Sequence, residues 1–216
     1  MELSKALSLY FIPDKEIGLG RDEIFQTIEA IKGGATAIQL RVKKRVDLEF
    51  YQIGLEMRRI TKENNVLFIV NDRLDIAMAI NADGVHLGKE DLPISVVKKL
   101  VSEDFIIGAS VSNEEEAIKA QREGAGYLAV SSIFPTTSKN NVEVVGIETL
   151  AKIVEITSLP VIGIGGINLE NVEQVLLAGA CGVSVISAIA SKDDILKATF
   201  EFKKKIIQFL KEGSIK

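Results

Sequence analysis

The chain has 216 residues, of which 47% are apolar and 26% charged, so it is long enough to form one large domain with a substantial core. Its net charge is -4 with acidic and basic residues interspersed, which argues against a nucleic-acid or anionic-membrane surface. No apolar run approaches the roughly 20 residues that cross a bilayer, and no signal-peptide pattern opens the chain, so we expect a cytoplasmic protein. A single Cys and a single His offer no soft metal-ligand cluster, so any bound metal should be a hard, oxygen-liganded ion.

Short apolar runs rich in β-forming residues recur along the chain, at residues 7–12, 37–40, 67–70, 84–87, 105–107, 127–130, 161–163 and 182–186. Amphipathic stretches of helical spacing separate them, such as Leu48, Tyr51, Leu55 and Met57, and a last helix is predicted over residues 194–210. Strict alternation of this kind predicts a parallel sheet covered by helices. We therefore predict an α/β protein, a single (β/α)8 TIM barrel domain over residues 1–216. The alternative is an open doubly wound sheet, but the chain lacks the glycine fingerprint that usually follows the first strand of such a sheet.

The second run ends in three long polar side chains, Gln39, Arg41 and Lys43. Strand side chains alternate between faces, so these three point the same way. A guanidinium fork, an ammonium and an amide together favour an anion clamp. The alternative is a half-exposed strand whose polar face meets only water. Barrel enzymes carry their reactive groups at the carboxyl ends of the strands, and this position favours the clamp.

Carboxylates follow the third and fourth runs, at Asp72 beside Asn71 and at Asp91. Two carboxylates on neighbouring loops suit one Mg²⁺ ion, which prefers one or two protein oxygens plus water and substrate phosphates. Helix capping is the structural alternative for each of the two acids. The lone histidine, His86, is expected to pack or hydrogen-bond inside the barrel and is assigned no role.

A second anion site is predicted from the later loops. Residues 136–139 offer three hydroxyls and a lysine, while Gly166 and Ser187 follow the last two strands, where barrels often bind phosphate. Ordinary turn chemistry explains the same residues without a ligand. Two anion sites, one with a metal and one without, indicate two phosphorylated ligands.

In this order, the motifs resemble the thiamine phosphate synthase family over nearly the whole chain: Gln39-Leu40-Arg41-Val42-Lys43, Asn71-Asp72, ADGVHLGKEDLP (residues 82–93), IGAS (107–110), FPTTSK (134–139), GIGGI (163–167) and VISAI (185–189). The resemblance implies a Mg²⁺-dependent transferase of thiamine biosynthesis. It joins 4-amino-2-methyl-5-hydroxymethylpyrimidine diphosphate to a (carboxy)thiazole ethyl phosphate, giving thiamine phosphate and pyrophosphate. In the family, pyrophosphate leaves before the thiazole nitrogen attacks.

The resemblance also implies a role for each matching residue. The pyrimidine diphosphate would be held by Gln39, Leu40, Arg41, Val42, Lys43, Asn71, Ser110 and Lys139, of which Arg41, Lys43, Ser110 and Lys139 are the expected catalytic residues. The metal ligands would be Asp72 and Asp91. The thiazole phosphate would be held by Thr136, Thr137, Ser138, Gly166, Ile186 and Ser187.

Two other functions stay open at this point. The sister thiazole tautomerase shares the barrel, but it uses a histidine shortly after the fifth-strand serine, where this chain has Ser110-Val111-Ser112-Asn113. A non-catalytic sensor of phosphorylated thiamine precursors would not need the complete clamp. Small-molecule substrates are expected as partners, without nucleic acid or membrane, and homo-oligomer formation is left open.

Overall fold

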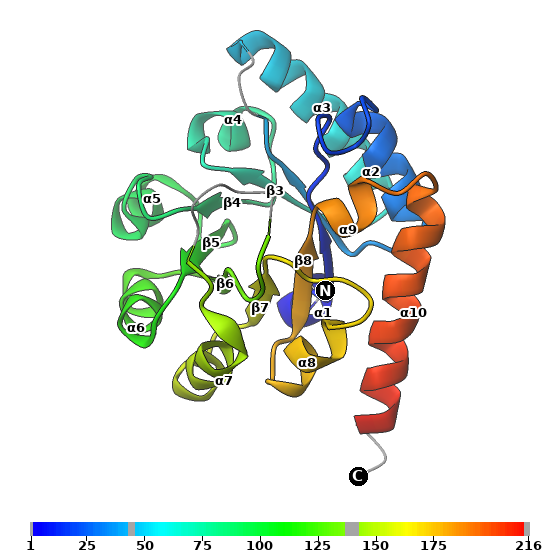
Figure 1. The fold of residues 1–216 in the computed structure, drawn as a ribbon. Coiled ribbons are helices and arrows are strands. Elements are labelled where there is room, and N and C mark those ends of the chain that lie inside the picture. Colours follow the sequence, from blue (N-terminus) through cyan, green and yellow to red (C-terminus); the bar gives the residue numbers. More distant parts are fainter. Residues whose placement is uncertain (1, 43–45, 137–142, 214–216) are drawn as a thin grey trace.

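The computed structural model describes residues 2–42, 46–136 and 143–213, without the side chains of residues 212 and 213. Within them, parallel strands close a barrel in sequence order from β1 to β8, so the predicted (β/α)8 fold is confirmed. Figure 1 shows most of the helices as a ring around these strands. The strands are β1 Leu9–Phe11, β2 Ala37–Leu40, β3 Leu67–Asn71, β4 Gly84–Leu87, β5 Ile106–Val111, β6 Tyr127–Ser131, β7 Val161–Ile164 and β8 Gly182–Val185.

Most of the helices connect successive strands and form the outer layer, while the first precedes β1 and the last two follow β8. The last of them, coloured orange to red in Figure 1, runs along the outside of the barrel against α2. The helices are α1 Leu3–Ala6, α2 Glu23–Lys32, α3 Asp47–Glu63, α4 Leu74–Ala79, α5 Ile94–Leu100, α6 Glu114–Glu123, α7 Gly146–Ile156, α8 Val172–Leu177, α9 Ser187–Ala190 and α10 Ile195–Gly213.

Side-chain capping explains where several of these helices begin. The Asp22 carboxylate accepts a hydrogen bond from Phe25 N at the start of α2, and the Asn113 side chain does the same for Glu116 N at the start of α6. After β7, α8 begins only at Val172. The Asn168 side chain accepts from Glu170 N at 2.8 Å and holds a turn there.

Two apolar layers hold the barrel together. Residues that point outward, such as Phe68 and Val130, pack in the core between strands and helices. Inward-pointing residues form a second, interior cluster that includes Tyr10, Ile69 and Ile162. Ala6 and Leu7 belong to the interior cluster, so the segment leading into β1 closes that end of the barrel. A ligand site therefore has to lie at the other end, where the strands finish.

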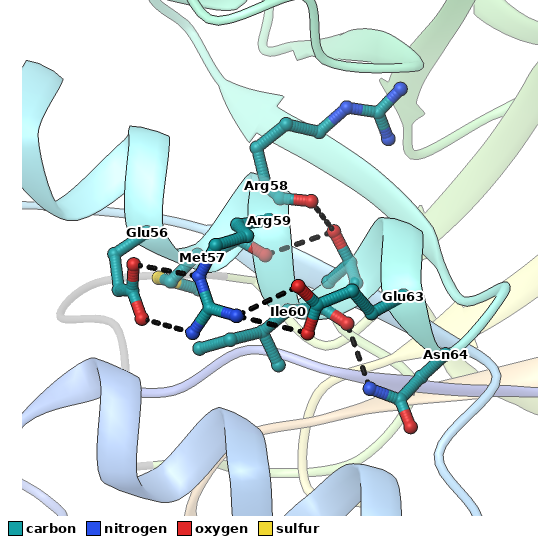
Figure 2. Close-up of polar contacts among 8 residues, drawn as sticks. Glu56, Met57, Arg58, Arg59, Ile60, Glu63 and Asn64 are labelled. Carbon is teal, nitrogen blue, oxygen red and sulfur yellow. Dashed lines mark hydrogen bonds and ion pairs between the residues drawn. The ribbon is translucent and has the colours of Figure 1, made fainter.

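Helix α3 buries only part of the apolar set that its spacing suggested. Leu48 and Leu55 are exposed at 66% and 42%, while Phe50 and Met57 are buried. On the outer face, Arg59 contacts Glu56 and Glu63 at 2.6 and 2.7 Å, as Figure 2 shows. Exposed pairs of this kind contribute little stability, so packing of the buried face fixes the position of the helix.

No helix in the described ranges has the length and apolar character needed to cross a membrane.

Candidate active site

The predicted clamp begins inside the barrel rather than in solvent. Ala37 belongs to the interior cluster, so Gln39, two residues on, points inward as well. Gln39 is only 3% exposed, and its Nε2 donates to the Tyr10 hydroxyl at 2.9 Å. The half-exposed strand is thus excluded for Gln39. The Leu40 side chain is fully buried in the outer core and Val42 packs partly against it, so these two can offer a ligand mainly their backbone.

Two adjoining cavities lie at the carboxyl ends of the strands. Five residues line both cavities, so the cavities adjoin there: Arg41, Asn71, His86, Ser110 and Ser131. We call them the inner cavity, which reaches into the barrel, and the outer cleft, which lies over the ends of β3 to β6. The inner cavity is also lined by Tyr10, Ile12, Gln39, Thr136, Ile162, Ile164, Gly165, Gly166, Ile167, Ser184, Ile186 and Ser187.

The two acids of the expected metal site line the same outer cleft. Asp72 and Asp91 both border it, together with Asn71. Neither acid caps a helix: the N-cap residues of α4 and α5 are Arg73 and Pro93, and no side chain makes a cap hydrogen bond there. Instead, Asp91 Oδ2 accepts from Gly88 N at 2.6 Å. Capping therefore no longer explains why both acids are present.

The backbone at Asp72 adopts a left-handed conformation, with φ at 61°. Few residues other than Gly, Asn and Asp adopt it readily, and such strain is concentrated at functional sites. The Asp72 N–H donates to the His86 carbonyl at 2.9 Å, which fixes the turn against β4. The turn therefore fixes the backbone position of Asp72 at the border of the outer cleft, and with it the point from which its side chain extends.

One cation of the outer cleft is already occupied by protein groups. Lys89 Nζ lies 2.7 Å from Glu116 Oε1 and 2.7 Å from Ser112 Oγ. Burial opposes ionisation of Glu116, but hydrogen bonds from Lys89 and Ser112 outweigh burial and lower the pKa of its carboxyl. A ligand anion would have to compete with Glu116 for Lys89. Arg41 borders both cavities and is the better candidate for binding that anion.

The inner cavity is also lined by the described members of the expected thiazole-phosphate set. Thr136, Gly166, Ile186 and Ser187 all line it. The Gly166 N–H donates to no acceptor in the described part of the chain, so it is free to donate to a ligand. A Cβ at Gly166 would lie 2.4 Å from Pro135 O, and φ there is 65°, so close packing requires glycine even without a ligand. Lys43, Thr137, Ser138 and Lys139 lie outside the described residues.

A chain of polar side chains crosses the barrel interior beneath the site. Tyr10 Oη lies 3.1 Å from Tyr127 Oη, which lies 2.9 Å from His86 Nδ1. The other ring nitrogen, His86 Nε2, lies 2.9 Å from Ser110 Oγ. We name Gln39, Tyr10, Tyr127, His86 and Ser110 the interior polar chain. Burial raises the pKa of Tyr10 and Tyr127 well above the usual tyrosine range, so both stay protonated.

Sequence reasoning did not assign several residues that border the site. His86 hydrogen-bonds inside the barrel as expected, but it also borders both cavities. Tyr10 and Tyr127 were counted only as strand residues, although a buried tyrosine hydroxyl usually needs a partner and could have indicated the chain. Ser184 is 2% exposed, its Oγ has no hydrogen-bond partner among the described residues, and it lines the inner cavity.

Comparison with known proteins decides the family. The profile of the family described as thiamine monophosphate synthase matches residues 9–189. The chain belongs to this family. It is 48% identical to the thiamine-phosphate synthase of Pyrococcus abyssi, over 97% of this chain and 100% of the relative. It is 50% identical to that of Coprothermobacter proteolyticus, over 91% of this chain and 93% of the relative.

A solved structure agrees with these relatives. The thiamine phosphate pyrophosphorylase from Pyrococcus furiosus superimposes with a TM-score of 0.90 at 45% identity, over 97% of this chain and all of that one. A 3-hexulose-6-phosphate synthase superimposes with a TM-score of 0.69 at 16% identity, which shows the barrel fold alone. The chain is thus an enzyme of the transferase class with thiamine-phosphate synthase activity, and small molecules are its substrates.

Proposed function

We propose that this enzyme joins 4-amino-2-methyl-5-hydroxymethylpyrimidine diphosphate to a (carboxy)thiazole ethyl phosphate, releasing pyrophosphate and, when the thiazole is carboxylated, carbon dioxide. The observation that carries the proposal is that the two cavities adjoin at Arg41 and Ser110. One side of that junction offers carboxylates for a metal, and the other offers hydroxyl and amide donors next to apolar walls. Two anionic substrates can therefore bind with their phosphate groups on opposite sides of the junction and their reacting atoms at the junction itself.

The outer cleft is the proposed place of the diphosphate. Arg41, Asn71 and Ser110 border it, and Lys43 and Lys139 are proposed to add charge from outside the described residues. Asp72 and Asp91 fit one Mg²⁺ ion, because two carboxylates leave the remaining positions to water and substrate phosphates. The described residues contain no group of three His, Cys, Asp or Glu side chains for a closed protein cage. When bound, Mg²⁺ would neutralise charge on the diphosphate.

The proposed reaction is a dissociative displacement. The bond between the pyrimidine methylene carbon and the diphosphate oxygen breaks, both electrons go to the pyrophosphate, and the carbon is left as a cation. Donors from Arg41 and Ser110 stabilise the growing negative charge, which is where preorganised groups contribute most. The thiazole nitrogen then supplies the electron pair for the new bond, and no protein nucleophile is required.

The walls of the inner cavity have a separate task in this scheme. Ile12, Ile162, Ile164 and Ile186 line it. Apolar walls exclude water, so they would protect a reactive cation from hydrolysis until the thiazole attacks. The thiazole phosphate would sit at Thr136, Gly166 and Ser187, and the Gly166 N–H is one donor for it.

A coupled assay tests the proposal. Mixing both substrates with Mg²⁺ should release one pyrophosphate for each thiamine phosphate formed, either substrate alone should release none, and EDTA should stop the release. Rapid isomerisation of the thiazole tautomer without the pyrimidine partner would instead identify a tautomerase. Tight binding of both compounds without turnover would identify a sensor.

A further inference from the structure

The interior polar chain has a direction that the hydrogen-bonding capacity of its members can determine. An amide nitrogen only donates, whereas a tyrosine hydroxyl has a single proton to give. Gln39 Nε2 donates to Tyr10, so the Tyr10 oxygen accepts at this end. Tyr10 contacts no other polar partner than Gln39 and Tyr127 in the described part of the chain. Its own proton therefore has to go to the Tyr127 oxygen.

The same reasoning continues through the histidine. Tyr127 accepts from Tyr10, so its proton goes to His86 Nδ1, 2.9 Å away. An imidazole nitrogen that accepts carries no proton, so the proton of the neutral ring is on Nε2. His86 Nε2 then donates to Ser110 Oγ across 2.9 Å. Ser110 accepts this bond and keeps its own proton for another acceptor.

The reverse direction leaves a buried donor without an acceptor. If Ser110 donated to His86, then His86 would donate to Tyr127 and Tyr127 to Tyr10. The Tyr10 oxygen would receive two hydrogen bonds, and its own proton would have no acceptor among the described residues. Tyr10 lines the inner cavity but is only 1% exposed, so almost none of its surface is open to water that could take that proton. An orphaned buried donor is unfavourable enough to select the first direction.

The barrel is built to place Tyr127 in this position. Gly108 lies opposite Tyr127 in the pairing of β5 with β6. A Cβ at residue 108 would lie 2.2 Å from Tyr127 Cζ and 2.4 Å from its Oη, so only glycine leaves room for the ring. Gly108 therefore lets the Tyr127 hydroxyl reach Tyr10 on one side and His86 on the other.

We infer that Tyr10, Tyr127 and His86 are positioning residues that turn the Ser110 hydroxyl into a fixed donor toward the diphosphate. Ser110 borders both cavities, so its free proton can point to an anion at their junction. A serine hydroxyl otherwise rotates and can accept as well as donate. The chain removes that freedom before substrate arrives, which is the kind of preorganisation that aids charge development. The identity of the anion rests on the proposed function, but the direction of the chain does not.

The tautomer of His86 tests the direction without any activity measurement. His86 is the one histidine in the sequence, so ¹⁵N-labelled histidine reports a single imidazole ring. The ligand-free wild type should show a protonated Nε2 and an unprotonated Nδ1. Tyr127→Phe removes the donor to Nδ1 and should produce a mixture of tautomers. A wild-type ring protonated on Nδ1, or on both nitrogens at neutral pH, would overturn the inference even if no variant could be purified.

A double-mutant cycle tests the effect on Ser110. Tyr127→Phe should lower kcat about tenfold, less than the roughly 10² expected for loss of the Ser110 donor itself, with little change in KM. In a Ser110→Ala background the same change should lower kcat less than about twofold, because nothing remains to be positioned. Tyr51→Phe, on the outer helix α3, is the matched control and should alter neither kcat nor the tautomer. Equal losses in both backgrounds would show that Tyr127 acts only structurally.

Failure of the proposed function gives a different result. In that case the wild-type tautomer would be as expected, but mixing the two substrates would release no pyrophosphate. Tyr10→Phe is the second variant if Tyr127→Phe does not fold. It removes the proton that Tyr127 accepts and keeps the ring, so it should also reduce the Nε2-protonated fraction. An unchanged tautomer in Tyr10→Phe would contradict this direction of the interior polar chain.

Discussion

Gly108→Ala should destabilise the enzyme strongly, because the added methyl group would overlap the ring of Tyr127. The new Cβ would lie 2.2 Å from Tyr127 Cζ, more than about 1 Å inside an ordinary carbon contact. Tyr127 is 0% exposed, so its ring cannot move aside into solvent. Overpacking of this kind costs about 1–3 kcal/mol. Loss of the hydrogen bonds to Tyr10 and His86 adds about 1 kcal/mol each, which gives about 3–5 kcal/mol in total.

Gly126→Ala is the matched control for this experiment. A Cβ at Gly126 would meet its nearest neighbours at 3.6 Å, an ordinary contact, and the position does not require a positive φ. Urea unfolding should therefore show the wild-type midpoint, or a slightly higher one, for Gly126→Ala and a much lower midpoint for Gly108→Ala. Stabilities of the two variants that agree within about 0.5 kcal/mol would refute the packing argument.

Three further outcomes are expected. Arg41→Ala should lower kcat by about 10²–10³ in the coupled assay, while Arg122→Ala on the exposed face of α6 should leave it unchanged; equal rates for both variants would remove Arg41 from the mechanism. Asp72→Asn and Asp91→Asn should each raise the Mg²⁺ concentration for half-maximal rate by about tenfold or more, and an unaltered Mg²⁺ titration would place the ion elsewhere. Burial raises the pKa of the Cys181 thiol to about 11, so its alkylation should be slow at pH 8 and should rise about tenfold per pH unit up to about pH 10, as measured by mass spectrometry; a plateau near pH 8.5 would contradict this.

The strand pattern predicted the fold because each run is apolar and each connection is amphipathic. Boundaries were less accurate, since β5 extends to Val111 beyond the predicted end at residue 107. That extension contains Gly108, Ala109 and Ser110, whose small side chains give no strand signal but fit inside a crowded barrel. On α3, two apolar stripes compete, and only the position of the neighbouring strands decides that Phe50 is buried and Leu48 is not.

The candidate site was predictable where a charged or polar residue directly follows a barrel strand, because such residues at that end of a barrel commonly bind ligands. Arg41, Asn71, Asp72, Asp91 and Ser110 all border the outer cleft. The interior polar chain was not predictable in the same way, because its members come from five different strands. Tyr10 and Tyr127 are 117 residues apart, and no local pattern indicates that their hydroxyls meet. Contacts of that kind depend on barrel closure and on the stagger of the strands.

The left-handed turn at Asp72 restricts which side chains evolution or a mutant library can place there. Glutamate would preserve the charge, yet its longer side chain carries no special tolerance for φ near 61°, so the substitution strains the backbone while it keeps the carboxylate. Alanine would both strain the backbone and remove the charge. A drop in activity could then not be assigned to one of these two effects. Glycine is relaxed in this conformation and asparagine tolerates it, so these two residues separate the chemistry of position 72 from its geometry.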